Sequence, residues 1–111
     1  MRNKIFTVDW CSVKKSGADE ERSFLVCGKL ESGILRTGSP VEIVKPSGES
    51  KEFFVTKVTM DGKNEPAEAG DEACLLFEDF ADSYDIIGLF RRRKVWRFTV
   101  ERGDTIYQIH Y

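Results

Sequence analysis

Apolar and polar side chains alternate along most of this chain, and that period of two restricts what it can fold into. In segment 5–11, Phe6, Val8 and Trp10 fall on one side of an extended chain and the intervening residues on the other. Such alternation is typical of β-strands with one buried face, whereas the period of a helix is hard to find here. Similar runs occupy 5–11, 23–30, 40–45, 52–60, 72–78, 94–100 and 105–111. The chain is therefore predicted to be all-β.

Short segments rich in turn residues separate these runs. Gly, Pro, Asn, Asp and Ser gather at 15–19, 37–40, 46–49, 61–64 and 101–104. Short strands at regular spacing, joined by such turns, predict a sandwich or a barrel. A length of 111 residues corresponds to one domain, 1–111. The segment 80–89 is compatible with either a helical turn or a loop.

The residue types needed for catalysis or for a metal site are sparse. The one histidine, His110, stands next to the C-terminal residue, and no phosphate-binding loop of the NTPase type is present. Three widely separated cysteines, Cys11, Cys27 and Cys74, lack the close pairing of a zinc site. We therefore expect no enzymatic activity, no cofactor and no metal.

The same composition suggests where the protein resides. An odd number of cysteines in a chain of this size favours three reduced thiols over a disulfide. No apolar run approaches the roughly 20 residues of a membrane-spanning helix, and no signal-peptide core follows the N-terminus. The expected localisation is cytoplasmic, with no membrane partner.

Positive charge is concentrated at the C-terminal end. Residues 1–90 hold 11 Lys and Arg against 17 Asp and Glu, a net charge of −6, whereas residues 91–111 hold 6 against 2, a net charge of +4. The overall charge of −2 hides this asymmetry. A basic end on an acidic body is a candidate binding face.

Glycines recur every five residues at Gly28, Gly33 and Gly38, with aliphatic residues between them. This stretch resembles the β-barrel second domain of translational GTPases, the family of elongation factor Tu. It fits the family pattern Gly-x-Val-x-x-Gly-x-Ile/Leu-x-x-Gly-x-x-Val if Leu30 replaces the first Val. The segment 67–77 is similar to the family's Ala-Gly-Asp turn and the strand that follows it.

The resemblance implies a small closed six-stranded Greek-key barrel that stands alone, without the family's GTP-binding domain. The family-like core would cover about 23–90, and 91–111 would add a basic strand or hairpin. Gly28, Gly33, Gly38 and Gly70 are interpreted as structural turn glycines, because glycine suits a positive φ or a close backbone approach.

Two positions depart from the family pattern. Elongation factor Tu has a Glu before the Ala-Gly-Asp turn and an Asn after it that help to hold aminoacyl-tRNA. Pro66 and Glu72 stand at the matching positions here. The resemblance therefore does not extend to aminoacyl-tRNA binding.

A basic run with neighbouring aromatic residues marks the start of the C-terminal segment. Its candidate nucleic-acid-binding residues are Arg91, Arg92, Arg93, Lys94 and Arg97. Guanidinium groups pair with phosphates and exposed aromatic rings stack on unpaired bases, so the combination suits RNA. The alternation of Trp96, Phe98 and Val100 predicts instead that these side chains are core.

Two functions remain open from the sequence. The first is a non-catalytic binding module, similar to a translation factor, that contacts ribosomal or other RNA through the basic strand. The alternative is a protein-interaction or accessory barrel with no nucleic-acid role, whose basic strand meets an acidic protein partner.

Overall fold

A computed structural model of the chain describes residues 2–16, 21–79, 83–88, 91–95 and 98–109, and in these ranges it contains strands and no helix. The all-β prediction is therefore confirmed. The strands are β1 (Arg2–Thr7), β2 (Trp10–Ser16), β3 (Glu21–Lys29), β4 (Ile34–Leu35), β5 (Pro40–Val44), β6 (Ser50–Phe54), β7 (Lys57–Thr59), β8 (Ala67–Glu68), β9 (Glu72–Asp79), β10 (Ser83–Gly88), β11 (Arg91–Val95) and β12 (Thr105–Ile109).

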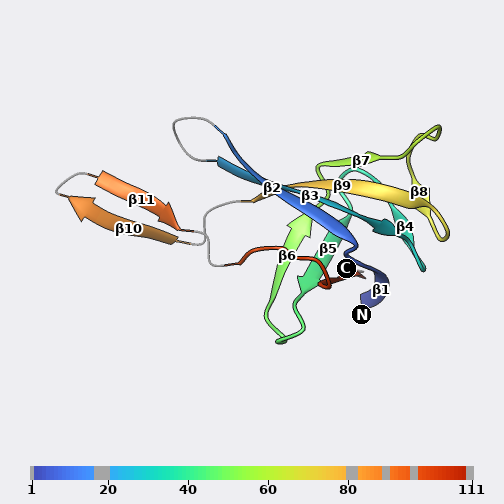
Figure 1. Ribbon diagram of the computed structural model, residues 1–111, viewed down its shortest axis with the longest axis horizontal. Coiled ribbons are helices and arrows are strands. Elements are labelled where there is room, and N and C mark those ends of the chain that lie inside the picture. Colours follow the sequence, from blue (N-terminus) through green and yellow to red (C-terminus); the bar gives the residue numbers. More distant parts are fainter. Residues whose placement is uncertain (1, 17–20, 80–82, 89–90, 96–97, 110–111) are drawn as a thin grey trace.

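Two four-stranded antiparallel sheets form the body (Figure 1). Sheet A has the order β1-β12-β5-β6, and sheet B has the order β2-β3-β9-β7. Two strand pairs, β4–β8 and β10–β11, complete the described ladders.

The closed six-stranded barrel is not seen, because none of the sheets in the described ranges closes on itself. The chain changes sheets between β1 and β2 and again between β6 and β7. At these corners the backbone forms isolated hydrogen bonds outside the ladders, among them Val8 N to Asp104 O at 2.8 Å and Thr56 N to Leu76 O at 2.8 Å. The backbone N–H groups at the corners therefore have hydrogen-bond acceptors, although no strand pairing continues there.

The core lies between the two sheets. Phe53 from β6 is its aromatic centre, with its ring centroid 6.0 Å from Phe24, 5.5 Å from Phe77 and 6.2 Å from Phe98. Along β3 and β9 every second side chain is buried, as the alternation predicts for a sheet with one solvent face. Phe98 and Val100 are buried as predicted, whereas Trp96 lies outside the described residues.

The four glycines play two different roles. Gly33, Gly38 and Gly70 have φ values of +82°, +91° and +94°, in the left-handed region that favours glycine. Gly28, by contrast, lies within β3 rather than in a turn, so its interpretation as a turn glycine is wrong. A Cβ there would stand 2.5 Å from Phe6 Cδ2, so this glycine allows close packing of a core ring.

Cys27 and Cys74 form a disulfide, which corrects the expectation of three reduced thiols. They are directly opposite in the β3–β9 register, with their Cα atoms 4.1 Å apart. The two cysteines are 47 residues apart in sequence, so no local pattern indicates that they pair. Cys11 is the free cysteine of the described ranges, and its Sγ donates to Val100 O at 3.5 Å.

The C-terminal residues take two different places in the fold. β11 pairs with β10, a strand at 83–88, so the expectation of a helical turn or a loop in 80–89 is wrong for these residues. β12 pairs with both β1 and β5 inside sheet A. The segment after the basic run is therefore an integral part of the body and not an appendage to a core that ends near residue 90.

The turn between β8 and β9 docks on the end of β3. Gly70 N donates to Leu30 O at 2.8 Å, and Leu30 N donates to Asp71 O at 2.9 Å. Lys63 Nζ donates to Asp71 Oδ2 at 2.6 Å, and the Glu68 N–H donates to the same oxygen at 2.8 Å. Because both bonds favour the charged carboxylate, the Lys63 bond first, the pKa of Asp71 lies below its usual range.

We expect the stability contributed by this carboxylate to be complete above the ordinary Asp pKa and lost as pH falls through the lower pKa of the folded state. An NMR titration of the Asp71 carboxyl carbon should give a midpoint below that of a model Asp. Lys63→Met should raise the midpoint, and Lys57→Met, at an exposed position of β7, should not. An unchanged midpoint in Lys63→Met would contradict the assignment.

Within the described ranges, no helix is long and apolar enough to cross a membrane.

Candidate nucleic-acid interface

The basic run lies in a hairpin that projects from the body. β10 and β11 form a two-stranded antiparallel sheet, and Figure 1 shows it extending away from sheets A and B. The molecule is accordingly elongated, with principal extents of 52 × 30 × 26 Å. In the described ranges β10 and β11 pair only with one another and with no strand of sheets A or B.

The hairpin is strongly positive. β11 contains Arg91, Arg92, Arg93 and Lys94, whereas β10 contains Asp85 as its only charged residue. In the register Asp85 pairs with Arg93, and the register shifts between Ile86 and Gly88. The structure thus places four of the five candidate residues on one strand of the ribbon, and Arg97 lies outside the described residues.

Arg22 sits where the chain leaves the body and returns to it. In β3 it pairs with Asp79, the last residue of β9 before the hairpin. Its Nη2 donates to Phe98 O, and its Nη1 donates to Thr99 Oγ1 at 3.5 Å, just after the hairpin. The guanidinium also stands 4.8 Å above the Phe24 ring. The buried Arg22 side chain therefore fixes the returning chain to β3, while the β3–β9 ladder holds the departing chain at Asp79.

A second buried polar contact fixes the returning chain. Asp104 is 2% exposed, and its Oδ2 accepts hydrogen bonds from Lys45 Nζ at 3.1 Å and from Glu101 N at 2.8 Å. The Lys45 ammonium lies 5.3 Å from the centre of the Phe98 ring. This carboxylate holds the 101–104 turn against sheet A, so that β12 enters between β1 and β5.

Sequence reasoning missed Arg22, Lys45 and Asp104. Isolated charged residues are usually exposed. The alternation nevertheless carried a signal for two of them, because Arg22 is in phase with the buried side chains of β3 and Lys45 with those of β5. For Asp104 the signal is the turn composition of 101–104, where an Asp that accepts from a backbone N–H three residues earlier is a common arrangement.

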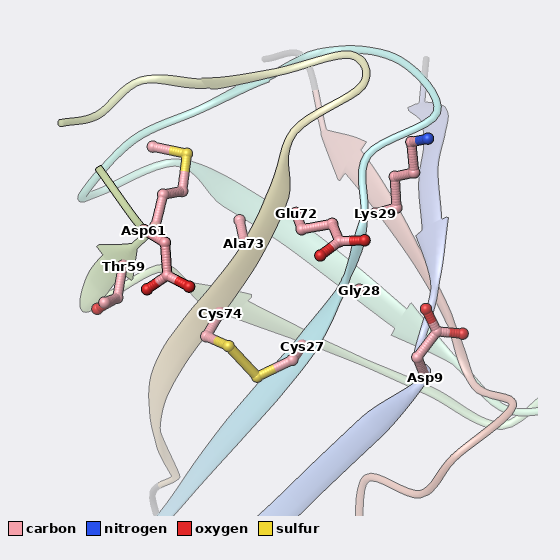
Figure 2. Close-up of a pocket in the computed structure, with 10 residues that line it drawn as sticks. Asp9, Cys27, Gly28, Lys29, Thr59, Asp61, Glu72, Ala73 and Cys74 are labelled. Carbon is pink, nitrogen blue, oxygen red and sulfur yellow. A yellow bond between two sulfur atoms is a disulfide. The ribbon is translucent and has the colours of Figure 1, made fainter. Parts of the chain in front are cut away.

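The body also has a pocket, remote in sequence from the basic run. It has a volume of about 340 Å³ and lies beside the Cys27–Cys74 disulfide (Figure 2). Asp9, Lys29, Asp61 and Glu72 contribute to its lining. No group of three or more His, Cys, Asp and Glu side chains in the described ranges is placed to hold a metal ion.

Comparisons with known proteins identify the fold. No family model matches the sequence, and no curated protein matches it. The structure of the S. cerevisiae Ski7 GTPase-like domain, bound to GDP and inorganic phosphate, superimposes with a TM-score of 0.68 at 15% sequence identity. The match covers 97% of this chain but 23% of that chain.

The fold of this chain is thus shared by part of a GTPase-like protein. The likeness agrees with the general resemblance to translational GTPases, and at 15% identity it concerns the fold alone. Because the chain spans less than a quarter of the length of that chain, the nucleotide ligands of that protein do not carry over to it.

Proposed function

We propose that the protein is a non-catalytic RNA-binding module, related in fold to the barrel-type second domain of translational GTPases. The contact is made by the β10–β11 hairpin, which presents Arg91, Arg92, Arg93 and Lys94 to the phosphate backbone. Ribosomal RNA is one RNA of this kind. The single observation that supports the proposal most is that the basic strand stands in a ribbon apart from the body.

The charge distribution favours RNA as the ligand. The body carries a net negative charge, so a polyanion is repelled from it and attracted to the hairpin. Arginine and lysine neutralise phosphates and release the counterions condensed on them, which makes the binding sensitive to salt. Phosphate contacts position a nucleic acid without reading its sequence, so we expect weak sequence preference.

Fixed attachment supports the same proposal. Arg22 binds Phe98 and Thr99, which follow the hairpin, and the Lys45–Asp104 pair fixes the 101–104 turn after them, so the returning chain is anchored to the body. The large exposed apolar side chains of the described residues, by contrast, lie on three separate strands: Trp10 and Val13 on β2, Ile34 on β4 and Phe54 on β6. Scattered apolar residues are ordinary on protein surfaces and do not by themselves indicate a protein partner.

Fluorescence anisotropy with a single-stranded and a hairpin RNA, across a range of salt concentrations, tests the proposal. With single-stranded RNA, Arg91, Arg92 and Arg93 changed together to Ala should reduce the salt slope by about 2 and the affinity by about 100-fold near 0.1 M salt. A matched variant removes three exposed charges from the body, at Lys14, Arg36 and Lys57. It should change the affinity little.

An absence of binding at low salt would overturn the RNA proposal and favour an acidic protein partner for the hairpin. Equal weakening by the two triple variants would also contradict it, because binding would then follow net charge and not the hairpin.

A further inference from the structure

The Cys27–Cys74 disulfide faces the outer surface of sheet B. Trp10, Cys27, Cys74 and Thr59 are successive neighbours across β2, β3, β9 and β7, and directly opposite residues share a face. The buried residues of β3 and β9 point to the other face, toward the core. The disulfide therefore belongs to the solvent side of the sheet.

The disulfide is accessible from the pocket. Both cysteines line the cavity, and both are partly exposed. Figure 2 shows the sulfur–sulfur bond between β3 and β9, with the labelled side chains of the lining around it. A cavity of about 340 Å³ is large enough for a small thiol to reach a sulfur atom.

The strands that the disulfide joins are paired without it. β3 and β9 are in register over eight residue pairs, from Arg22–Asp79 to Lys29–Glu72, with cysteines at one of them. Phe24, Val26, Leu75 and Phe77 from the same two strands are fully or almost fully buried on the core side. Hydrogen bonds and core packing therefore hold β3 against β9 whether the sulfur–sulfur bond is closed or open.

The pocket is negatively charged. Asp9, Asp61 and Glu72 line it together with one lysine, Lys29, so the formal net charge of the lining is −2. Lys29 and Glu72 are directly opposite in the register, and their formal charges cancel in the sum. Asp9, whose N–H donates to Cys27 O at 3.1 Å, and Asp61 then supply the excess negative charge.

We propose that Cys27–Cys74 is a thiol–disulfide exchange site that accepts a small thiol carrying a positive charge. This inference concerns a different region from the proposed RNA contact and does not depend on it. The thiolate attacks one of the two sulfurs and forms a mixed disulfide, while the bond between the cysteines breaks and its electron pair leaves on the other cysteine. That cysteine takes up the proton that the attacking thiol lost.

A second thiol molecule completes the reaction. Its thiolate attacks the mixed disulfide, releases the small-molecule disulfide and leaves two protein thiols. Two equivalents of thiol are oxidised as one protein disulfide is reduced, so atoms and electrons balance. An ammonium group on the thiol is attracted by Asp9 and Asp61, which raises the local concentration of the reactant.

Exchange rates with three thiols test this proposal on the full chain. The probes are cysteamine, 2-mercaptoethanol and 2-mercaptoethanesulfonate, which are cationic, neutral and anionic. Each rate is corrected for thiolate fraction and divided by the rate of the same thiol with bis(2-hydroxyethyl) disulfide. Mass spectrometry of alkylated protein identifies the mixed disulfide at Cys27 or Cys74. The free thiol of Cys11 should contribute little to the exchange, because burial and nearby Asp104 raise its pKa and so lower its thiolate fraction.

At low salt we expect the corrected rate of cysteamine to exceed that of 2-mercaptoethanesulfonate by about ten-fold, from two charges acting across several ångströms of screened solvent. Asp9→Asn combined with Asp61→Asn should bring the ratio close to one. Glu49→Gln combined with Glu78→Gln removes the same charge from exposed positions outside the pocket lining and should leave the ratio unchanged. Circular dichroism checks that each variant is folded.

Three results would overturn the proposal. The first is a ratio of one in the unmodified protein, and the second is equal loss of selectivity in both double variants. The third is a protein whose Cys27 and Cys74 remain separate thiols after mild oxidation, or whose disulfide resists all three probes in excess.

Discussion

Asp104→Ala should lower the free energy of unfolding by about 3 kcal/mol, because it leaves a largely buried ammonium group without its carboxylate. The Lys45 side chain is 13% exposed, and its other anionic contact in the described residues is Glu101, at 3.4 Å and 71% exposed. The substitution also removes the acceptor of the Glu101 N–H. Urea denaturation followed by circular dichroism measures the change.

A double-mutant cycle separates the stability contributed by the Lys45–Asp104 ion pair from that of the hydrogen bond within the 101–104 turn. Lys45→Met combined with Asp104→Ala should cost less than the sum of the single changes, because neither charge is then left alone. Glu101→Gln is the matched control and should change stability by less than about 0.5 kcal/mol, as exposed pairs do. Additive single changes would show that Lys45 and Asp104 do not stabilise one another.

Gly28→Ala should destabilise the protein by about 3 kcal/mol, at the upper end of the usual cost of overpacking. The added Cβ would stand 2.5 Å from Phe6 Cδ2, 2.8 Å from Phe6 Cε2 and 3.1 Å from Thr7 O. The Phe6 ring is fully buried, so it has no free space into which to move. Thermal or urea unfolding measures the loss.

Two further variants distinguish overpacking from backbone strain. Phe6→Leu combined with Gly28→Ala should recover part of the stability lost by Gly28→Ala alone, because the smaller side chain makes room for the methyl group. Gly48→Ala, where φ is +95° and nothing lies within 4 Å of the added Cβ, should cost about 1 kcal/mol through backbone strain. Equal losses in Gly28→Ala and Gly48→Ala would contradict the packing explanation.

The strands and the core could be predicted because their signal is local. Alternation in 23–30 and 72–78 reflects one buried face, and the structure buries Phe24, Val26, Leu75 and Phe77 accordingly. The disulfide could not be predicted in the same way, because it depends on which residue of β9 lies opposite Cys27. That register follows from packing across the whole sheet and leaves no mark near either cysteine.

The candidate site shows the same division between local and distant information. The arginine run is plain in the sequence, but its place in a separate ribbon depends on pairing with β10, whose sequence alternates poorly. Gly28 was interpreted from the spacing of glycines, yet its role is set by Phe6, which comes from another strand of another sheet. Contacts between distant segments decide both features.

The position of β12 has a consequence for the order in which the protein assembles. β1 emerges from the ribosome before β12, its ladder partner in the described structure, and β12 follows more than ninety residues later. Sheet A therefore stays open until β12 is made, while the β2–β3 and β10–β11 hairpins can form locally. Closing so distant a contact is slow. Until β12 is made, the edge of β5 that pairs with it has unpaired backbone N–H and C=O groups, which can pair with another chain.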